Sequence, residues 1–165
     1  MNSEHPQAKF MQTAIDMAQQ SYGGLDYGIG AVVVKDDEVI SMATNITRST
    51  NDPTQHAEVV AISRAARKLG SRHLQGCVLY TTHEPCAMCT SAAVWGKLDG
   101  IVFGAPMEDM IEHDKREENK NYNWRIINFK AEEIIAKSPN QPWLIGGFMR
   151  EECNKLFCKE VIGIK

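Results

Sequence analysis

The sequence predicts a layered α/β domain in which the later strands run parallel. Two observations support this prediction. Short apolar segments typical of buried strands alternate along the chain with segments whose apolar residues recur at helical spacing. The chain has 165 residues, the length of one ordinary domain, and its composition of 43% apolar and 24% charged residues is that of a globular protein. Because strand–helix–strand units usually pack as parallel strands, this alternation favours an α/β fold.

The first half of the chain holds a helix, a hairpin and a second helix. Residues 7–21 place apolar side chains at helical spacing, and a pair of glycines then ends the helix. Residues 28–45 contain two β-branched runs separated by a charged Lys-Asp-Asp turn, a pattern typical of a hairpin. Residues 56–70 again carry one apolar stripe, and Gly70 is expected to end this second helix.

The second half is predicted to continue as strands and helices. Apolar strands are expected at residues 76–82, 99–105 and 124–129, and helices at residues 85–98 and 146–162. The sequence contains neither an internal repeat nor a Gly- or Pro-rich linker. We therefore interpret residues 1–165 as a single domain.

Composition and charge limit the class of partner and the cellular compartment that we expect. The net charge is −3 and the pI about 6.0, which argues against a nucleic-acid partner and favours a small-molecule substrate. No apolar run approaches the roughly 20 residues of a membrane span, and the N-terminus lacks the basic and apolar stretches of a secretory signal. Five cysteines, an odd number, argue against a disulfide framework. We therefore expect a cytoplasmic protein without membrane association.

Cys86 and Cys89 are the first candidates for chemistry. They lie three positions apart at the start of a predicted helix, behind Pro85, so both thiols share a face near the positive end of the helix dipole. That position favours thiolates, which bind zinc but also exchange disulfides. On these residues alone, a zinc site, a thioredoxin-like redox site and two packed thiols all remain open.

A histidine and a glutamate thirty residues upstream favour zinc. His56 opens a predicted helix, where it could meet the start of the helix that carries the two cysteines. One imidazole and two thiolates leave zinc an open fourth position, as in catalytic sites. Glu58 can stand beside that position and transfer protons without binding the metal. A fully ligated, non-enzymatic zinc domain would need a fourth ligand, for which spare histidines such as His83 are the candidates.

Three sequence stretches together resemble a known enzyme superfamily. NDPTQHAEVVAI, LYTTHEPCAMC and IVFGA are similar to the cytidine deaminase-like zinc hydrolases, in the branch of guanine, cytosine and tRNA adenosine deaminases. The resemblance covers residues 7–105 and implies a three-layer α/β/α fold with a five-stranded mixed sheet, usually in a homodimer. Residues 106–165 match weakly and are expected to form a variable part that closes the pocket.

The resemblance also implies roles for individual residues. The histidine and the two cysteines correspond to ligands of Zn²⁺, and Glu58 corresponds to the proton shuttle. Asn45 corresponds to an asparagine that hydrogen-bonds the base, and the peptide groups of Ala57 and Glu84 would flank the attacked carbon. The implied reaction is hydrolysis of an amino group from a ring carbon, with release of ammonia.

The favoured substrate is a free nucleobase or nucleoside, in particular an aminopurine such as guanine. Trp95 stands where guanine deaminases likewise carry a tryptophan and could stack on a base, although helix packing explains it equally well. Asp114, in the acidic segment after Ala105, could accept hydrogen bonds from a purine. Adenosine in tRNA and free cytosine are the alternative substrates.

Overall fold

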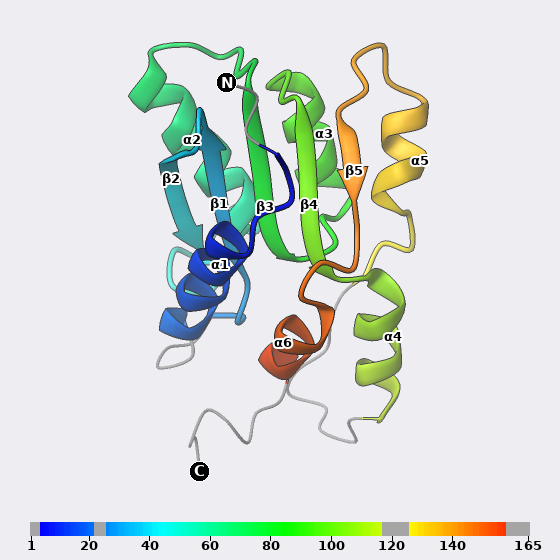
Figure 1. Ribbon diagram of the computed structural model, residues 1–165. Coiled ribbons are helices and arrows are strands. Elements are labelled where there is room, and N and C mark those ends of the chain that lie inside the picture. The colour runs from blue at the N-terminus through cyan, green and yellow to red at the C-terminus, as the bar shows by residue number, and fades with distance from the viewer. Residues whose placement is uncertain (1–3, 22–25, 117–125, 158–165) are drawn as a thin grey trace.

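A five-stranded mixed sheet forms the middle layer of the protein (Figure 1). The structure, a computed structural model, describes residues 4–21, 26–116 and 126–157. In the order β2-β1-β3-β4-β5, β1 pairs antiparallel with both β2 and β3, whereas β3, β4 and β5 run parallel. The strands are β1 at Gly30–Lys35, β2 at Glu38–Thr44, β3 at Cys77–His83, β4 at Gly100–Ala105 and β5 at Trp143–Ile145.

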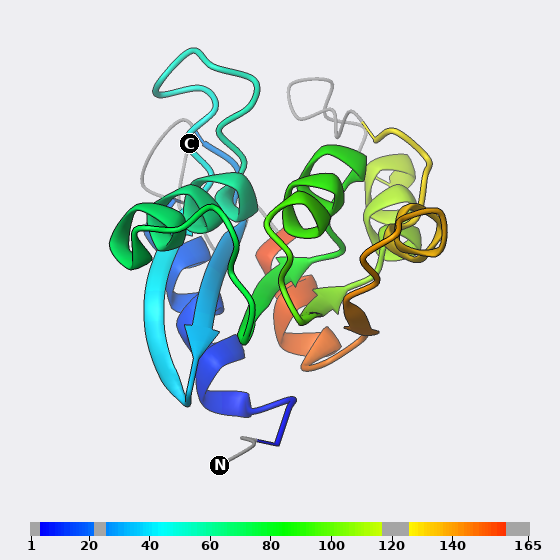
Figure 2. The same cartoon turned by 90° about the horizontal axis from the view of Figure 1, so that it is seen from above.

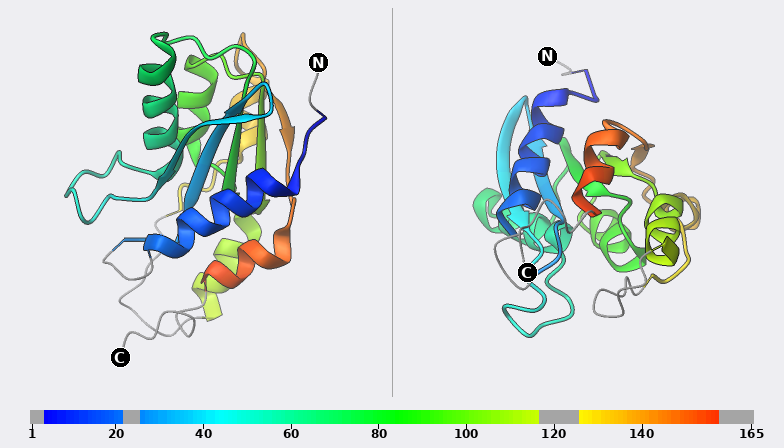
Figure 3. Two further views of the ribbon diagram at one scale, coloured as in Figure 1. Left: turned by 60° about the vertical axis from the view of Figure 1, so that its left-hand side comes forward. Right: turned by 90° about the horizontal axis from the view of Figure 1, so that it is seen from below.

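Helices cover both faces of the sheet (Figure 2). One face carries α1 (Ala8–Gln20) and α6 (Arg150–Asn154), which lie on the same side in Figure 3, and the other carries α2 (Ala57–Leu69), α3 (Ala87–Trp95) and α5 (Ala131–Ala136). α4 (Met107–Arg116) follows β4 and lies beyond the carboxyl ends of the parallel strands (Figure 1). The structure therefore confirms the predicted three-layer α/β/α fold. None of the helices in the described part of the chain is long and apolar enough to cross a membrane.

The two faces of the sheet bury separate apolar clusters. Val32 and Tyr80 belong to the cluster beneath α1, whereas Val33 and Leu79 belong to the cluster beneath α2 and α3. A strand that is covered on both faces needs apolar residues at successive positions. This requirement explains why β1 and β3 appear in the sequence as almost continuous apolar runs.

The helices α2 and α3 both begin at the carboxyl edge of the sheet. Their N-cap residues are His56 and Cys86, which have extended backbone angles and make no side-chain capping hydrogen bond. The imidazole and the thiol are therefore available for other contacts. At its far end α2 stops at Gly70, whose left-handed φ of 62° suits glycine, as the sequence predicted.

The strand expected at residues 124–129 is not present where the structure describes the chain. Residues 126–130 are irregular, and residues 124 and 125 lie outside the described ranges. The fifth strand is instead Trp143–Ile145. With only three residues, this strand is too short to show a strand pattern in the sequence, and the apolar residues at 126–127 serve a pocket instead.

The helical prediction for the C-terminal part is also wrong in extent. The helix expected at residues 146–162 is limited to α6, which gives way to a 3₁₀ turn at Lys155–Phe157, and residues 158–162 lie outside the described ranges. The six-residue helix α5 was not predicted. Helices this short are held by tertiary contacts and carry almost no periodic signal of their own.

Candidate metal centre and active site

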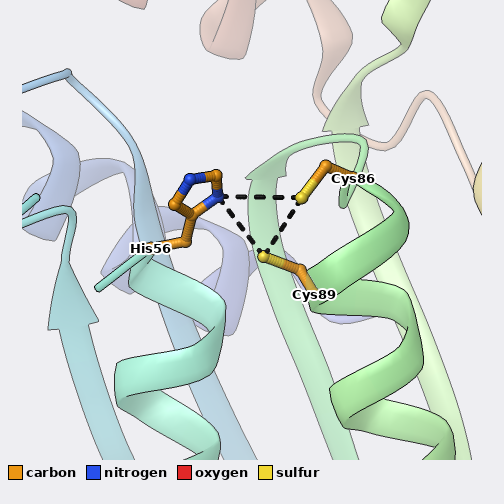
Figure 4. Close-up of side chains that lie close together, drawn as sticks. All are labelled: His56, Cys86 and Cys89. Carbon is orange, nitrogen blue, oxygen red and sulfur yellow. Dashed lines mark hydrogen bonds between the residues drawn. The ribbon is translucent and has the colours of Figure 1, made fainter. Parts of the chain in front are cut away.

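His56, Cys86 and Cys89 meet where α2 and α3 begin (Figure 4). The Nδ1 atom of His56 lies 3.7 Å from the Sγ atom of Cys86 and 3.5 Å from that of Cys89, and the two sulfur atoms are 3.6 Å apart. Within the described ranges this is the only group of three or more His, Cys, Asp or Glu side chains with the spacing of a metal site. The three predicted ligands are thus brought together by the fold.

The spacing of these three atoms fits tetrahedral zinc. Zinc bonds of about 2.3 Å to sulfur and about 2.0–2.1 Å to nitrogen, at tetrahedral angles, separate two sulfurs by about 3.8 Å and a nitrogen from a sulfur by about 3.6 Å. The observed separations of 3.5–3.7 Å are close to these values. His83, the nearest spare histidine in the sequence, is not part of the group. The donor set therefore matches a three-ligand site with an open position, as in catalytic zinc enzymes.

The protonation of the cysteine pair also suits a metal. A hydrogen bond to Cys89 lowers the pKa of the Cys86 thiol to about 4, helped by the imidazole of His56. The same hydrogen bond raises the pKa of Cys89 well above its usual value, because the proton that remains after Cys86 has ionised is shared between the two sulfur atoms and is held more tightly. The hydrogen bond to Cys86 raises the pKa of His56. The site thus carries a thiolate even before metal binding releases the remaining protons.

Glu58 lies in the first turn of α2, beside the metal-binding group, with 3% of its surface exposed. Its Oε2 atom makes no hydrogen bond within the protein. Burial raises the pKa of the carboxyl group, and the nearby Cys86 acts in the same direction. A buried carboxyl group with one oxygen uncommitted is suited to accept and return a proton.

A cavity of about 280 Å³ opens beside these residues. It is near the lower end of the range for small-molecule sites, about 300–1,000 Å³, and therefore suits a compact ligand. Its polar walls come from His56, Glu58, His83, Glu84 and Cys86. Its apolar walls are Ile29, Pro53, Met88, Met107, Met110, Ile126 and Ile127.

Three further predicted residues lie at or near this site. Ala57 is the buried first residue of α2, between the histidine ligand and Glu58. Glu84 lines the cavity. Asn45 is buried, and its Oδ1 atom accepts hydrogen bonds from the N–H and hydroxyl groups of Thr47 at 3.1 and 2.8 Å. That carbonyl oxygen is already engaged, and Asn45 is not among the cavity-lining residues.

Trp95 and Asp114 are not brought to the cavity. Trp95 ends α3, about 13 Å along the helix from Cys86 at 1.5 Å per residue. Its side chain is 83% exposed and lines a different surface pocket. Asp114 lies in the second half of α4 and is absent from the cavity lining.

The sequence analysis missed the methionines that line the cavity. Met88 comes from α3, whereas Met107 and Met110 come from α4. Methionine fits irregular apolar surfaces and packs well against flat rings. The spacing of Met107 and Met110 along one helix face was the available signal, but it would have been equally consistent with core packing.

His83 also contributes to the cavity wall. Its ring is 2% exposed, and its Nδ1 atom lies 2.8 Å from the hydroxyl oxygen of Thr82. Burial lowers the pKa of this imidazole to about 3, so it is neutral at pH 7. The cavity lining that the structure describes therefore includes neither Lys nor Arg, and His83 adds no positive charge at neutral pH.

Comparisons with known proteins agree with this geometry. Residues 4–105 match the family described as the cytidine and deoxycytidylate deaminase zinc-binding region. The chain is 40% identical to the tRNA-specific adenosine deaminase of Aquifex aeolicus over 96 residues, which are 58% of the chain. It is 38% identical to the guanine deaminase of Bacillus subtilis over 104 residues, which are 62% of the chain. These alignments span 64% and 67% of the two relatives, about two thirds of their length.

A solved structure extends the similarity over most of the chain. It comes from a study of A-to-I editing by tRNA:A34 deaminases at the wobble position of transfer RNA. It superposes with a TM-score of 0.74 at 28% sequence identity, covering 91% of this chain and 99% of the solved one. Residues 4–105, which match the family model, contain all three residues of the His-Cys-Cys group. The chain belongs to the cytidine and deoxycytidylate deaminase family of zinc-binding proteins.

Proposed function

We propose that this protein is a zinc-dependent hydrolase that removes the amino group from an aminopurine ring as ammonia. The observation that carries this proposal is the buried Glu58 carboxyl group beside the three metal-ligand side chains, all in the wall of one cavity. Zinc, when bound by these ligands, supplies an electrophilic centre that activates water as the nucleophile. A disulfide-exchange role does not account for the histidine or the glutamate.

The protein's own residues would bind the ring and move the protons. Glu58 takes a proton from the attacking water and passes it to the ring nitrogen. It then takes the proton of the hydroxyl group that has formed on the ring carbon and passes it to the amine, so that the C–N bond breaks, ammonia leaves and a carbonyl group remains. The methionine-rich walls exclude water from the ring. The peptide groups of Ala57 and Glu84 would flank the attacked carbon, and the side-chain NH2 group of Asn45 would hydrogen-bond the base, since only its Oδ1 atom is engaged by Thr47.

We favour a free base, in particular guanine, as the substrate. Lys and Arg are absent from the cavity lining in the described ranges, and the net charge of the chain is −3. Tight binding of RNA depends on neutralising several phosphates with such residues. Trp95 and Asp114 lie away from the cavity and do not support this choice. The preference for a free base therefore depends on the negative net charge of the chain and on the apolar walls of the cavity.

Adenosine in a tRNA anticodon is the second candidate. It is favoured by the solved structure from the study of tRNA:A34 deaminases, which covers 91% of this chain and therefore extends beyond residue 105. Both candidates are aminopurines, and the same proton-transfer geometry serves either ring. They differ in what surrounds the base, which can be tested directly.

Ammonia release from a panel of substrates separates these possibilities. The panel comprises guanine, guanosine, adenine, adenosine, cytosine and an anticodon stem-loop RNA, with the Glu58→Gln variant as a control for contaminating enzymes. We expect turnover of guanine that the control lacks. Turnover of the stem-loop without any free base would replace guanine by tRNA, and no turnover of any purine would contradict the proposal.

A further inference from the structure

Residues 84–86, between β3 and α3, form a loop that carries Cys86 and is called the metal-binding loop here. The side chain of Glu84 connects this loop to two helices that are distant in sequence. Glu84 stands between the end of β3 and Cys86, and its own N–H donates to the carbonyl oxygen of Ala105 at 2.8 Å. Its carboxylate is buried, with 6% of the residue exposed. Oε2 accepts the N–H of Met107 at 2.9 Å, and Oε1 accepts the N–H of Ala131 at 3.1 Å.

Both donors are the first residues of helices. Met107 begins α4 and Ala131 begins α5. The first N–H groups of a helix have no partner within it and form the positive end of its dipole, so a carboxylate is a favourable acceptor. Bonds from N–H groups to a charged oxygen are among the stronger hydrogen bonds in proteins. One buried carboxylate therefore caps two helices that start 24 positions apart in sequence.

The residues next to these two capped positions form much of the apolar wall of the cavity. Met107 and Met110 belong to the first turns of α4, and Ile126 and Ile127 precede α5. Ile127 is 68% exposed although it lines the cavity, so it stands at the cavity mouth. The two hydrogen bonds to Glu84 therefore join both parts of this wall to the residue that precedes Pro85 and Cys86.

A second link between the same segments is much weaker. Lys130, just before α5, forms an ion pair with Glu108 of α4. Their side chains are 40% and 55% exposed, and exposed pairs contribute little to stability. The chain thus offers two glutamates that join α4 to the start of α5, one buried and one exposed.

We propose that the Glu84 carboxylate is a positioning residue that sets the shape of the substrate cavity by fastening residues 107–110 and 126–131 to the metal-binding loop. This role belongs to the side chain and is separate from that of the Glu84 peptide group. It makes Glu84 a determinant of substrate binding, while proton transfer stays with Glu58. The kinetic arm of its test depends on the proposed deaminase function, but the exchange arm does not.

The test compares zinc-loaded wild type with Glu84→Gln and with Glu108→Gln as the matched control. Amide hydrogen exchange is followed in residues 107–116 and 126–136, together with zinc content. In the wild type the Met107 and Ala131 amides should be protected, unlike ordinary first-turn amides. In Glu84→Gln both segments should exchange roughly tenfold faster with zinc retained, because one acceptor and the charge are lost. Glu108→Gln should exchange like the wild type.

The kinetic arm uses guanine, or the anticodon stem-loop if that is the substrate found. Glu84→Gln should raise KM roughly tenfold while kcat changes less than about threefold. Unprotected Met107 and Ala131 amides in the wild type, wild-type exchange in Glu84→Gln, or equal effects in Glu108→Gln would overturn the proposal. Loss of zinc, or a fall in kcat at unchanged KM, would also overturn it. If no substrate is turned over, the exchange arm still decides.

Discussion

At the scale of single residues, the site depends on side chains placed at helix starts. Cys86 is the N-cap residue of α3 and Glu58 lies in the first turn of α2, yet their environments favour opposite protonation states. Hydrogen bonds lower the pKa of the Cys86 thiol, whereas burial raises the pKa of the Glu58 carboxyl group. A thiolate is the form of cysteine that binds a metal, and a carboxyl group with a raised pKa is suited to proton transfer.

We expect Cys86→Ala to abolish zinc binding. Only two ligands of the group would remain, so the zinc content should fall from about one per chain to roughly a tenth of that or less. Elemental analysis of the purified protein measures this content. Cys77→Ala is the control, because Cys77 is buried in β3 outside the metal-binding group and the variant should keep its zinc. Full zinc content in Cys86→Ala would remove this cysteine from the ligand set.

We expect Glu58→Gln to keep its zinc and lose most turnover. The amide preserves the shape of the side chain but cannot shuttle a proton, a function that typically contributes about 10²- to 10⁴-fold to the rate. Steady-state ammonia release and zinc content on the same preparation give both quantities. Wild-type turnover, or loss of zinc along with activity, would show that Glu58 has another role.

At the scale of elements, α1 packs closely against β1 at Gly30. A Cβ atom on Gly30 would lie 1.9 Å from the carbonyl oxygen of Ala14 and 2.6 Å from the backbone nitrogen of Ala18. Both are backbone atoms of α1, which cannot rotate away as a side chain could. Glycine at the start of β1 thus allows the helix to approach the sheet directly.

We expect Gly30→Ala to lower the free energy of unfolding by about 1–3 kcal/mol or more, the usual cost of overpacking. Gly70→Ala is the comparison, because a Cβ atom there meets open space and the substitution costs only the left-handed backbone angle, about 1–2 kcal/mol. Urea denaturation of both variants measures the two costs. If Gly30→Ala were as stable as the wild type, α1 would not be fixed against β1 as described.

At the scale of the whole molecule, α3 leaves a large apolar side chain exposed at its end. The helix consists almost entirely of apolar and small residues, and Trp95 at its end is 83% exposed. Helices that are apolar on several sides are usually buried, and large exposed apolar side chains often mark an interface. This surface supports the prediction of a homodimer.

We expect light scattering at micromolar concentration to give twice the chain mass of 18.4 kDa. Trp95→Arg should shift the population towards 18.4 kDa, since a charge would replace the most exposed apolar side chain of α3. The variant should keep its zinc, because Trp95 lies at the opposite end of α3 from the ligands. A wild-type mass of 18.4 kDa would contradict the dimer.

The sequence by itself determined the metal chemistry and most of the elements of the sheet. His56, Cys86 and Cys89 could be recognised because ligand type and helix-start position are local properties, and long apolar elements such as β3 and α2 carry their period in the chain. Only the tertiary structure decided which residues form the cavity. Met107 and Ile127 line it although they lie 20 positions apart in sequence, whereas Trp95 ends the helix that begins beside Cys86 and still lines a different pocket. Such contacts depend on how elements pack against one another, which local pattern does not encode.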